Sequence, residues 1–353
     1  PRSTLFPYTT LFRSNNNQNE LKNEEVNKNI NKEKENSSQN LFYKINRQFP
    51  KIGLINLGDT SYLNVIIQSL GNIEELLLFF LDSDKITIFD NFKKDFPLSY
   101  EMKEIFSHLY PPIEGSIEKV YAPLSLLEYF SKDERYSFDK RSNPIYFLKD
   151  LLKDLDSELN TLRKNKKVNK ENKSNREDTI NSGLKYILET NDSPIFKIFS
   201  FNIINELICE TCCESIYDLK NNNSFKLNIR GCYSSKNRNI TIKDCVKNQY
   251  EESQKSKRLF CQKCHQTKTF FDYSKIYSSP NIFLFLIDRG IDFNQKNNKL
   301  LNIPLIIEDQ LDLEYYIEKK DSPTKYELIG IVSILIKDKK YVDTIPIRFR
   351  ILY

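Results

Sequence analysis

One short stretch of the chain, residues 53–70, has the residue types and spacing of a nucleophile placed at the start of a helix. An apolar lead-in and a turn containing Gly58 come first. The apolar spacing then predicts a helix that begins near Thr60 and is capped by it. Free N–H groups and the helix dipole favour negative charge at such an end, so a thiol there would have a lowered pKa. The residue in that place is Ser61, whose hydroxyl is far harder to deprotonate than a thiol.

Four cysteines in the second half of the chain have the spacing of metal ligands. Cys209 and Cys212 form one Cys-x-x-Cys pair, and Cys261 and Cys264 form another. Each pair can present two thiolates from one tight turn, and two such turns complete a tetrahedral shell of four sulfur atoms for Zn²⁺. The sequence therefore predicts a structural zinc ion. The alternative is that the four thiols remain reduced, as the remnant of a site that no longer binds metal.

The other candidates near this site are less constrained. Cys213 could replace Cys212 as a ligand. Cys232 and Cys245 have no partner at metal-binding spacing and are expected to be core or surface thiols. His265 adjoins the second pair, and a complete set of four cysteines makes it a neighbour rather than a ligand.

The nucleophile-like stretch resembles the cysteine box of the ubiquitin-specific proteases, the peptidase C19 family of deubiquitinating thiol peptidases. The resemblance implies a papain-like cysteine peptidase fold with a helical thumb, zinc-ribbon fingers and a β-sheet palm. It also implies that Asn56 holds the place of the residue that stabilises the oxyanion. The alternative is an ordinary junction between a loop and a helix. The residues that match the box, with only the nucleophile changed, are Gly53, Leu54, Asn56, Gly58, Thr60, Tyr62, Asn64 and Gln68.

The chain offers little that could act as a general base. A hydroxyl or thiol nucleophile needs an adjacent base, usually His, and the chain has two histidines, His108 and His265. The resemblance places the family's catalytic His near Asp343 or Thr344, and no His is present there. The third catalytic residue of the family would lie beyond Tyr353, so the C-terminus is expected to be truncated.

Composition narrows the class of protein. Lys plus Arg exceed Asp plus Glu by 53 to 48, and much of the excess lies in residues 163–178, so no nucleic-acid-binding face is expected. No apolar run approaches the ~20 residues of a membrane span, so no membrane association is expected. The seven cysteines, four of them in two pairs, and the lack of a secretory signal indicate a reducing intracellular compartment, the cytoplasm or nucleus.

Polar tracts divide the chain. Residues 1–14 look like translated sequencing-adapter sequence and are set apart from the fold as an artefact. Residues 15–40 are almost wholly Asn, Lys, Glu, Gln and Ser, and this composition predicts a disordered tail. The resemblance then assigns residues 41–353 to one protease-like domain. Its expected parts are a thumb at residues 50–160, a disordered insertion at 161–183, and fingers and palm at 190–353.

Periodicity predicts a helical first half and a strand-rich second half, which is the α+β class. The expected helices lie at residues 62–82, 100–109, 124–130 and 143–159. The expected strands lie at residues 196–208, 225–229, 269–277, 281–287, 326–336 and 345–352.

The resemblance and the changed residues together predict a ubiquitin-specific-protease-like protein that is catalytically inactive. Such a protein would bind ubiquitin, ubiquitinated proteins or another partner as a scaffold. One alternative is an active ubiquitinyl hydrolase, in which Ser61 works with a base from elsewhere in the chain. The other is a scaffold of splicing complexes, because one branch of the family has lost its catalytic residues and acts there, and residues 142–147 are mildly similar to that branch.

Overall fold

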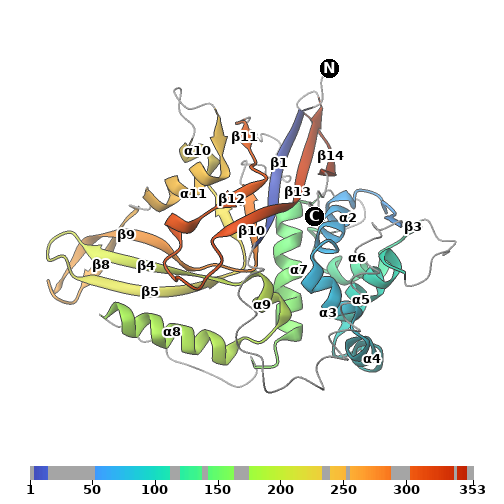
Figure 1. Ribbon diagram of the computed structural model, residues 1–353, viewed down its shortest axis with the longest axis horizontal. Helices are drawn as coiled ribbons and strands as arrows, with labels where there is room; N and C mark the ends of the chain where they lie inside the picture. The colour runs from blue at the N-terminus through green and yellow to red at the C-terminus, as the bar shows by residue number, and fades with distance from the viewer. Residues whose placement is uncertain are drawn as a thin grey trace.

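The structure is a computed structural model in which a helical region, a six-stranded sheet and a four-stranded sheet lie side by side (Figure 1). The predicted α+β class is therefore confirmed. The predicted tail at residues 15–40 lies outside the described residues. The structure describes residues 4–14, 52–111, 120–136, 142–162, 175–232, 239–251, 255–287, 303–337 and 340–347.

The helical region is built around two amphipathic helices, α2 (Ser61–Leu70) and α7 (Pro144–Leu159). Their buried side chains recur at helical spacing and join one apolar cluster with those of the neighbouring helices. The predictions for α5, α6 and α7 are confirmed. The neighbouring helices are α3 (Glu74–Leu81), α4 (Ser83–Asn91), α5 (Pro97–Leu109), α6 (Leu124–Phe130) and α9 (Pro194–Phe199).

The single helix predicted over residues 62–82 is wrong, because the chain breaks within it. Gly71 ends α2, and its carbonyl oxygen accepts a hydrogen bond from the Tyr110 hydroxyl at 2.8 Å. The Asn72 side chain donates to the Gln68 carbonyl oxygen at 2.6 Å, and α3 leaves at 90° to α2. Gly followed by Asn is a helix stop signal that outweighs the continuous apolar pattern. In the described part of the chain no single helix is long and apolar enough to cross a membrane, and only this bent pair passes by length and composition.

The six-stranded sheet is covered on both faces. It has the order β12-β13-β1-β10-β6, β14 also pairs with β13, and only the pair of β10 and β6 is parallel. Every residue of β10 is buried, and alternate residues join the helical cluster on one face and a second cluster with α11 on the other. The strands are β1 (Thr4–Ser14), β6 (Phe225–Leu227), β10 (Ile282–Ile287), β12 (Gln310–Asp312), β13 (Lys325–Lys337) and β14 (Lys340–Ile347). The helices of the second face are α10 (Ile229–Cys232) and α11 (Ile242–Glu251).

The assignment of residues 1–14 to a part outside the fold is wrong for Thr4–Ser14, which form strand β1. This strand pairs antiparallel with β10 along one edge and with β13 along the other. Leu11 and Phe12 are buried on opposite faces of the sheet, one in each apolar cluster. The alternation of apolar side chains suits a strand whatever the origin of the segment. The origin as adapter sequence stays a prediction.

The four-stranded sheet is antiparallel throughout and has the order β5-β4-β9-β8. Helix α8 (Arg176–Thr190) covers one face of it through the apolar side chains of Ile180 and Ile187. The strands are β4 (Phe201–Cys209), β5 (Ser215–Asn222), β8 (Lys255–Cys261) and β9 (Gln266–Ser278).

The disordered insertion predicted over residues 161–183 is wrong at its C-terminal end, where α8 begins. The Asn175 side chain accepts a hydrogen bond from the Glu177 backbone N–H at 2.9 Å, which caps the helix. Glu177 and Asp178 add negative charge to its first turn. Residues 163–174 of the predicted insertion lie outside the described residues.

Most predicted strands overlap observed strands, with errors at several of their ends. The strand predicted over residues 196–208 is wrong at its start, because Ser193 caps α9 and Pro194 is its first residue. The last predicted strand overlaps β14, and residues 348–352 lie outside the described residues. Strands β5 and β8 were not predicted, because their polar side chains hide the alternation.

Candidate functional site

Ser61 is the first residue of α2, so its side chain lies at the N-terminus of that helix. Gly58 has a φ of 112°, which only glycine adopts readily, and this allows the tight turn before the helix. The prediction that Thr60 caps the helix is wrong. Its hydroxyl instead accepts from the Leu57 backbone N–H at 2.9 Å and donates to Asn56 Oδ1 at 3.1 Å. The backbone N–H groups at this end of α2 are therefore left without a side-chain cap.

The Asn56 side chain is fixed by its hydrogen bonds to Thr60. Its Oδ1 atom accepts from both the backbone N–H and the hydroxyl of Thr60, each at 3.1 Å. Because this oxygen is committed, the NH₂ group is the part of the side chain left to donate to an oxyanion. The Asn64 side chain donates to the Ile55 carbonyl oxygen at 2.9 Å and so ties α2 to the same loop.

The helix behind Ser61 is anchored in the core. The Tyr62 ring packs against Tyr136 and Phe147, with ring centroids 6.0 and 5.5 Å apart. Burial raises the pKa of the Tyr62 hydroxyl, which has no hydrogen-bond partner among the described residues. Tyr62 therefore has a packing role, whereas Ser61 is only half-buried.

The strand that carries Asp343 and Thr344 packs against the Ser61 helix, since α2 contacts both β13 and β14. In the sheet, Asp343 lies opposite Leu335 and Thr344 lies opposite Ile334. The two predicted base positions therefore lie within β14, a strand that is paired with β13 and contacts α2.

The two histidines of the chain are held at other places. His108 Nδ1 donates to the Glu104 carbonyl oxygen at 2.8 Å, and its ring stacks on Tyr121 of β3 (Val120–Tyr121) with centroids 4.2 Å apart. His265 directly follows the second Cys-x-x-Cys pair. His108 therefore contacts Glu104 and Tyr121, and His265 lies at a cysteine turn.

The four predicted metal ligands converge at one end of the four-stranded sheet. Their sulfur atoms all lie within 4.8 Å of one another. The Sγ atoms of Cys209 and Cys264 are 4.0 Å apart, and those of Cys212 and Cys261 are 3.5 Å apart. Two thiolates on one tetrahedral Zn²⁺ lie about 3.8 Å apart, given a Zn–S distance of about 2.3 Å. The cluster therefore fits a metal ion.

The two Cys-x-x-Cys turns have the same backbone shape. The residue after each second cysteine has a left-handed conformation, with φ of 56° at Cys213 and 53° at His265. The Cys213 N–H donates to the Cys209 carbonyl oxygen at 3.0 Å, which closes the first turn. Cys213 is exposed and lies outside the cluster, so Cys212 is the ligand candidate. An ion pair of 3.2 Å between Lys263 and Glu214 joins the turns.

The thiols of the cysteine cluster differ in pKa. Burial opposes ionisation of Cys209, but hydrogen bonds from the backbone N–H groups of Cys212 and Thr211 outweigh it and lower its pKa to about 7. The hydrogen bond with the Cys212 side chain and burial raise the pKa of Cys264 to about 12. A divalent cation lowers the pKa of every thiol that it binds, so loading the cluster would release protons.

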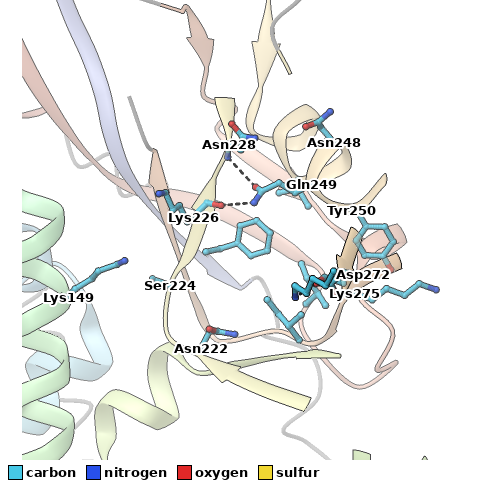
Figure 2. Close-up of a pocket in the computed structure, with 16 residues that line it drawn as sticks. Lys149, Asn222, Ser224, Lys226, Asn228, Asn248, Gln249, Tyr250, Asp272 and Lys275 are labelled. Atoms are coloured by element: carbon cyan, nitrogen blue, oxygen red, sulfur yellow. Dashed lines mark hydrogen bonds and ion pairs between the residues drawn. The ribbon is translucent and has the colours of Figure 1, made fainter. Parts of the chain in front are cut away.

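A pocket of about 760 Å³ is lined by residues of α7, both sheets and α11 (Figure 2). Gln249 of α11 closes one wall. Its Nε2 donates to the Lys226 carbonyl oxygen at 2.8 Å, and its Oε1 accepts from the Asn228 N–H at 3.3 Å. Sequence reasoning missed this pocket because its lining comes from segments far apart in the chain. Its charged residues are Lys149, Lys226, Lys257, Lys275 and Asp272.

The pocket and α8 lie on opposite faces of the four-stranded sheet. Ile203 lines the pocket, whereas Ile204 packs under α8. Neighbouring residues of a strand point to opposite faces, so the covered face and the hollow face are distinct. Asp272 pairs with Lys257, and Lys275 pairs with Glu318 at 3.8 Å. Lys149 and Lys226 add to these pairs, so the lining of the pocket carries more positive than negative charge.

A family model described as "Ubiquitin carboxyl-terminal hydrolase" matches residues 52–335. This match ends before Asp343 and Thr344. Ubiquitin carboxyl-terminal hydrolase 10 of Saccharomyces cerevisiae is 28% identical over 104 residues, which are 28% of this chain and 13% of that protein. The chain thus aligns with a small part of that relative.

Two solved structures have a similar fold. One is the SAGA Ubp8/Sgf11/Sus1/Sgf73 DUB module bound to ubiquitin aldehyde, with a TM-score of 0.57 and 17% identity over 84% of this chain and 62% of the other. The second is the SAGA DUB module bound to monoubiquitin, with a TM-score of 0.57 and 14% identity over 86% of this chain and 71% of the other. This likeness confirms the predicted peptidase fold.

Proposed function

Because the chain belongs to the ubiquitin carboxyl-terminal hydrolase family, we propose that it binds ubiquitin without hydrolysing ubiquitin conjugates. The observation that carries the proposal is Ser61 as the first residue of α2. A thiolate at this place would be stabilised by the helix dipole, whereas a hydroxyl does not ionise near neutral pH without a base. His108 is hydrogen-bonded to the Glu104 carbonyl oxygen and His265 follows the second Cys-x-x-Cys pair, which supports the same conclusion.

The loop before Ser61 keeps the shape of a binding site. The hydrogen bonds among Asn56, Leu57 and Thr60 involve no atom of the nucleophile. An exchange of sulfur for oxygen at residue 61 therefore leaves the loop unchanged. The Asn56 NH₂ group and the uncapped N–H groups of α2 would donate to a backbone carbonyl of a bound C-terminal peptide.

The pocket of Figure 2 is the surface that we assign to the folded part of ubiquitin. It lies beside α7 and on the face of the four-stranded sheet that α8 leaves uncovered. The two structures of similar fold hold ubiquitin aldehyde and monoubiquitin, which supports ubiquitin as the partner of this chain. In this assignment the lysines of the pocket pair with carboxylates of the partner.

We assign a structural zinc ion to Cys209, Cys212, Cys261 and Cys264. When bound, the ion would hold the two turns together and take no part in peptide chemistry. The strands that end in these turns also line the pocket, through Lys257 of β8 and Asp272 of β9. Metal binding would therefore support the ubiquitin-binding face indirectly.

The proposal is tested by measuring binding and turnover on the same full chain. We expect titration into isotope-labelled ubiquitin to shift ubiquitin resonances, and a fluorogenic amide of the ubiquitin C-terminus to stay intact. Ser61→Ala should change neither result. Turnover that Ser61→Ala abolishes would establish an active hydrolase instead. An absence of any resonance shift at high micromolar chain would exclude the ubiquitin part of the proposal.

Charge reversal locates the binding face. Lys226→Glu places a carboxylate at the pocket without changing the backbone atoms that hold Gln249. We expect it to weaken ubiquitin binding about tenfold, as loss of a complementary charge near a binding surface does. The matched control is Lys185→Glu, an exposed position of α8 on the other side of the sheet. Equal weakening by both variants would exclude the pocket as the site.

A further inference from the structure

Two cysteines outside the metal cluster, Cys232 and Cys245, lie next to each other. Cys232 ends α10 and Cys245 lies in α11. Helices α10 and α11 are in contact, and the Cys232 Sγ atom lies 3.8 Å from the carbonyl oxygen of Asp244, the residue before Cys245. Cys245 belongs to the apolar cluster on the α11 face of the six-stranded sheet, and Cys232 packs against that cluster. We propose that this pair is the site of a reversible intrachain disulfide, independent of ubiquitin binding.

Cys245 is held in place by the cap of its own helix. The Thr241 N–H donates to Asp244 Oδ2 and the Asp244 N–H donates to Thr241 Oγ1, each at 3.0 Å. This reciprocal pair is a capping box, and Glu308 adds a further bond by accepting from the Ile242 N–H at 3.2 Å. The start of α11 is therefore fixed, and with it the direction from which the Cys245 sulfur can be approached.

Cys232 is the more accessible partner. It is half-buried, whereas Cys245 is fully buried. Its thiol also contacts the Asn228 carbonyl oxygen at 3.4 Å, which keeps it at the junction of α10 and α11. The hydrogen bond with Cys232 and burial raise the pKa of Cys245. An oxidant from solution thus reaches Cys232 first, while Cys245 stays a thiol until its neighbour has reacted.

A second metal site is the competing explanation of a thiol pair beside carboxylates. Asp244 and Glu308 are near enough to act electrostatically on Cys245. Among the described residues, however, the one group of three or more ligands that could hold a metal ion is the cluster of Cys209, Cys212, Cys261 and Cys264. Asp244 and Glu308 do not form such a group with the two thiols, and this favours the disulfide.

The oxidant that we infer is a peroxide. The Cys232 sulfur attacks the O–O bond of hydrogen peroxide, which forms a sulfenic acid and releases one water. The Cys245 sulfur then forms the S–S bond as the S–O bond breaks, and the Cys245 proton leaves with the hydroxyl group as a second water. In total two thiols lose two electrons and two protons, and one peroxide becomes two waters. A dithiol such as dithiothreitol reverses the reaction by exchange.

The bond would join α10 to α11 at one wall of the Figure 2 pocket. Asn248, Gln249 and Tyr250 of α11 line that pocket, and Asn228 directly precedes α10. A crosslink across a short loop restricts the unfolded chain more than the folded one. We expect oxidation to raise the Tm by on the order of 5 °C for a chain of this size.

The test is peptide mapping of the full, zinc-loaded chain after mild treatment with hydrogen peroxide. We expect a linked peptide that contains Cys232 and Cys245, which dithiothreitol converts back to two thiols. Cys232→Ser should give no linked peptide and no rise in Tm. Cys213→Ser should behave as the native chain, since Cys213 is exposed and outside both groups. Zinc content is followed in parallel, so that damage to the metal cluster is recognised.

The proposal is overturned if peroxide takes Cys232 to the sulfinic acid or links it to a second chain while Cys245 stays reduced. It is also overturned if the linked peptide forms only after zinc is lost. Either result would contradict the disulfide without contradicting ubiquitin binding, because the mapping of thiols uses no ubiquitin.

Discussion

The four-cysteine cluster and the Ser61 loop are both built from short turns. They differ in whether the reactive side chain, a cysteine thiol or the Ser61 hydroxyl, also stabilises its turn. In the cluster, left-handed residues after each pair bring four sulfur atoms within 4.8 Å, and a metal ion bound by them would hold the turns together. In the loop, Gly58 and the hydrogen bonds between Asn56 and Thr60 shape the backbone, and the Ser61 side chain adds nothing to them. The thiols of the cluster would therefore be needed for the structure of their turns, whereas the Ser61 loop keeps its structure whichever side chain stands at residue 61.

Loss of one sulfur should have the largest effect, because the cluster depends on its ligands. We expect Cys261→Ser to abolish stoichiometric zinc binding, since structural zinc contributes ~10–16 kcal/mol to small metal domains. Hydrogen exchange should then accelerate in β4 and β8, whose ends form the turns, and stay slow in α2. Metal analysis and amide exchange measured by mass spectrometry check both parts.

Cys213→Ser is the matched control for this variant, since Cys213 lies one residue outside the cluster and is exposed. It should keep its zinc and its slow exchange. Equal zinc loss in both variants would mean that Cys213 is a ligand in solution. Acidification should also release the metal, because bound thiolates must take up protons to leave, so zinc content falls as pH falls.

Removal of residues 1–14 should affect the Ser61 loop and α2 more than the four-cysteine cluster. Leu11 packs in the apolar cluster that also holds α2, and Phe12 is buried on the other face. Loss of two such side chains and a central strand should lower the free energy of unfolding by at least ~5 kcal/mol. Amide hydrogen exchange should accelerate in α2 but not in the turns of the four-cysteine cluster. Denaturant unfolding of residues 15–353 beside the full chain measures this.

The same comparison decides whether the N-terminal segment contributes to the fold in solution. If residues 15–353 are as stable as the full chain, β1 contributes nothing to the fold in solution. If the shortened chain loses stability as expected, the strand belongs to the sheet.

The sequence predicted features that depend on local signals. Asn143 and Pro144 mark the start of α7, and the cysteine spacing identifies all four candidate ligands. It could not predict features made by distant segments. The proximity of Cys232 and Cys245 depends on the docking of α10 onto α11, and neither cysteine has a spacing signal. The break after α2 was missed because a long apolar run concealed its stop signal.

Ser61→Cys tests whether the loop and the N-terminus of α2 still favour a thiolate at residue 61. A thiol at the uncapped N-terminus of α2 should have a pKa about one unit below the ordinary value. Its thiolate fraction at pH 7 is then about tenfold higher. Because a thiolate of lower pKa is also less nucleophilic, the rate of alkylation should exceed that of exposed Cys213 by about threefold. Because the pKa is lowered, the rate should fall only at more acidic pH. Mass spectrometry of the two peptides gives both rates.

The same variant should leave the fluorogenic ubiquitin amide intact. Without a neighbouring base that takes up the thiol proton, no group delivers a proton to the leaving amine. Turnover by Ser61→Cys would reveal a base that acts on residue 61. Equal alkylation rates at residues 61 and 213 would instead mean that the helix end provides no electrostatic stabilisation.

Cys213→Gly should produce the smallest effect and in the opposite direction, because it relieves backbone strain in the first cysteine turn. With φ of 56°, Cys213 has a backbone conformation that favours glycine, and its N–H bond to the Cys209 carbonyl oxygen needs no side chain. We expect a gain of up to ~1 kcal/mol in the free energy of unfolding, with zinc content unchanged. Thr211→Gly in the same turn lacks a positive φ and should lose a similar amount. Chemical denaturation of both variants checks the sign, and destabilisation by both would mean that the Cys213 side chain supports the turn.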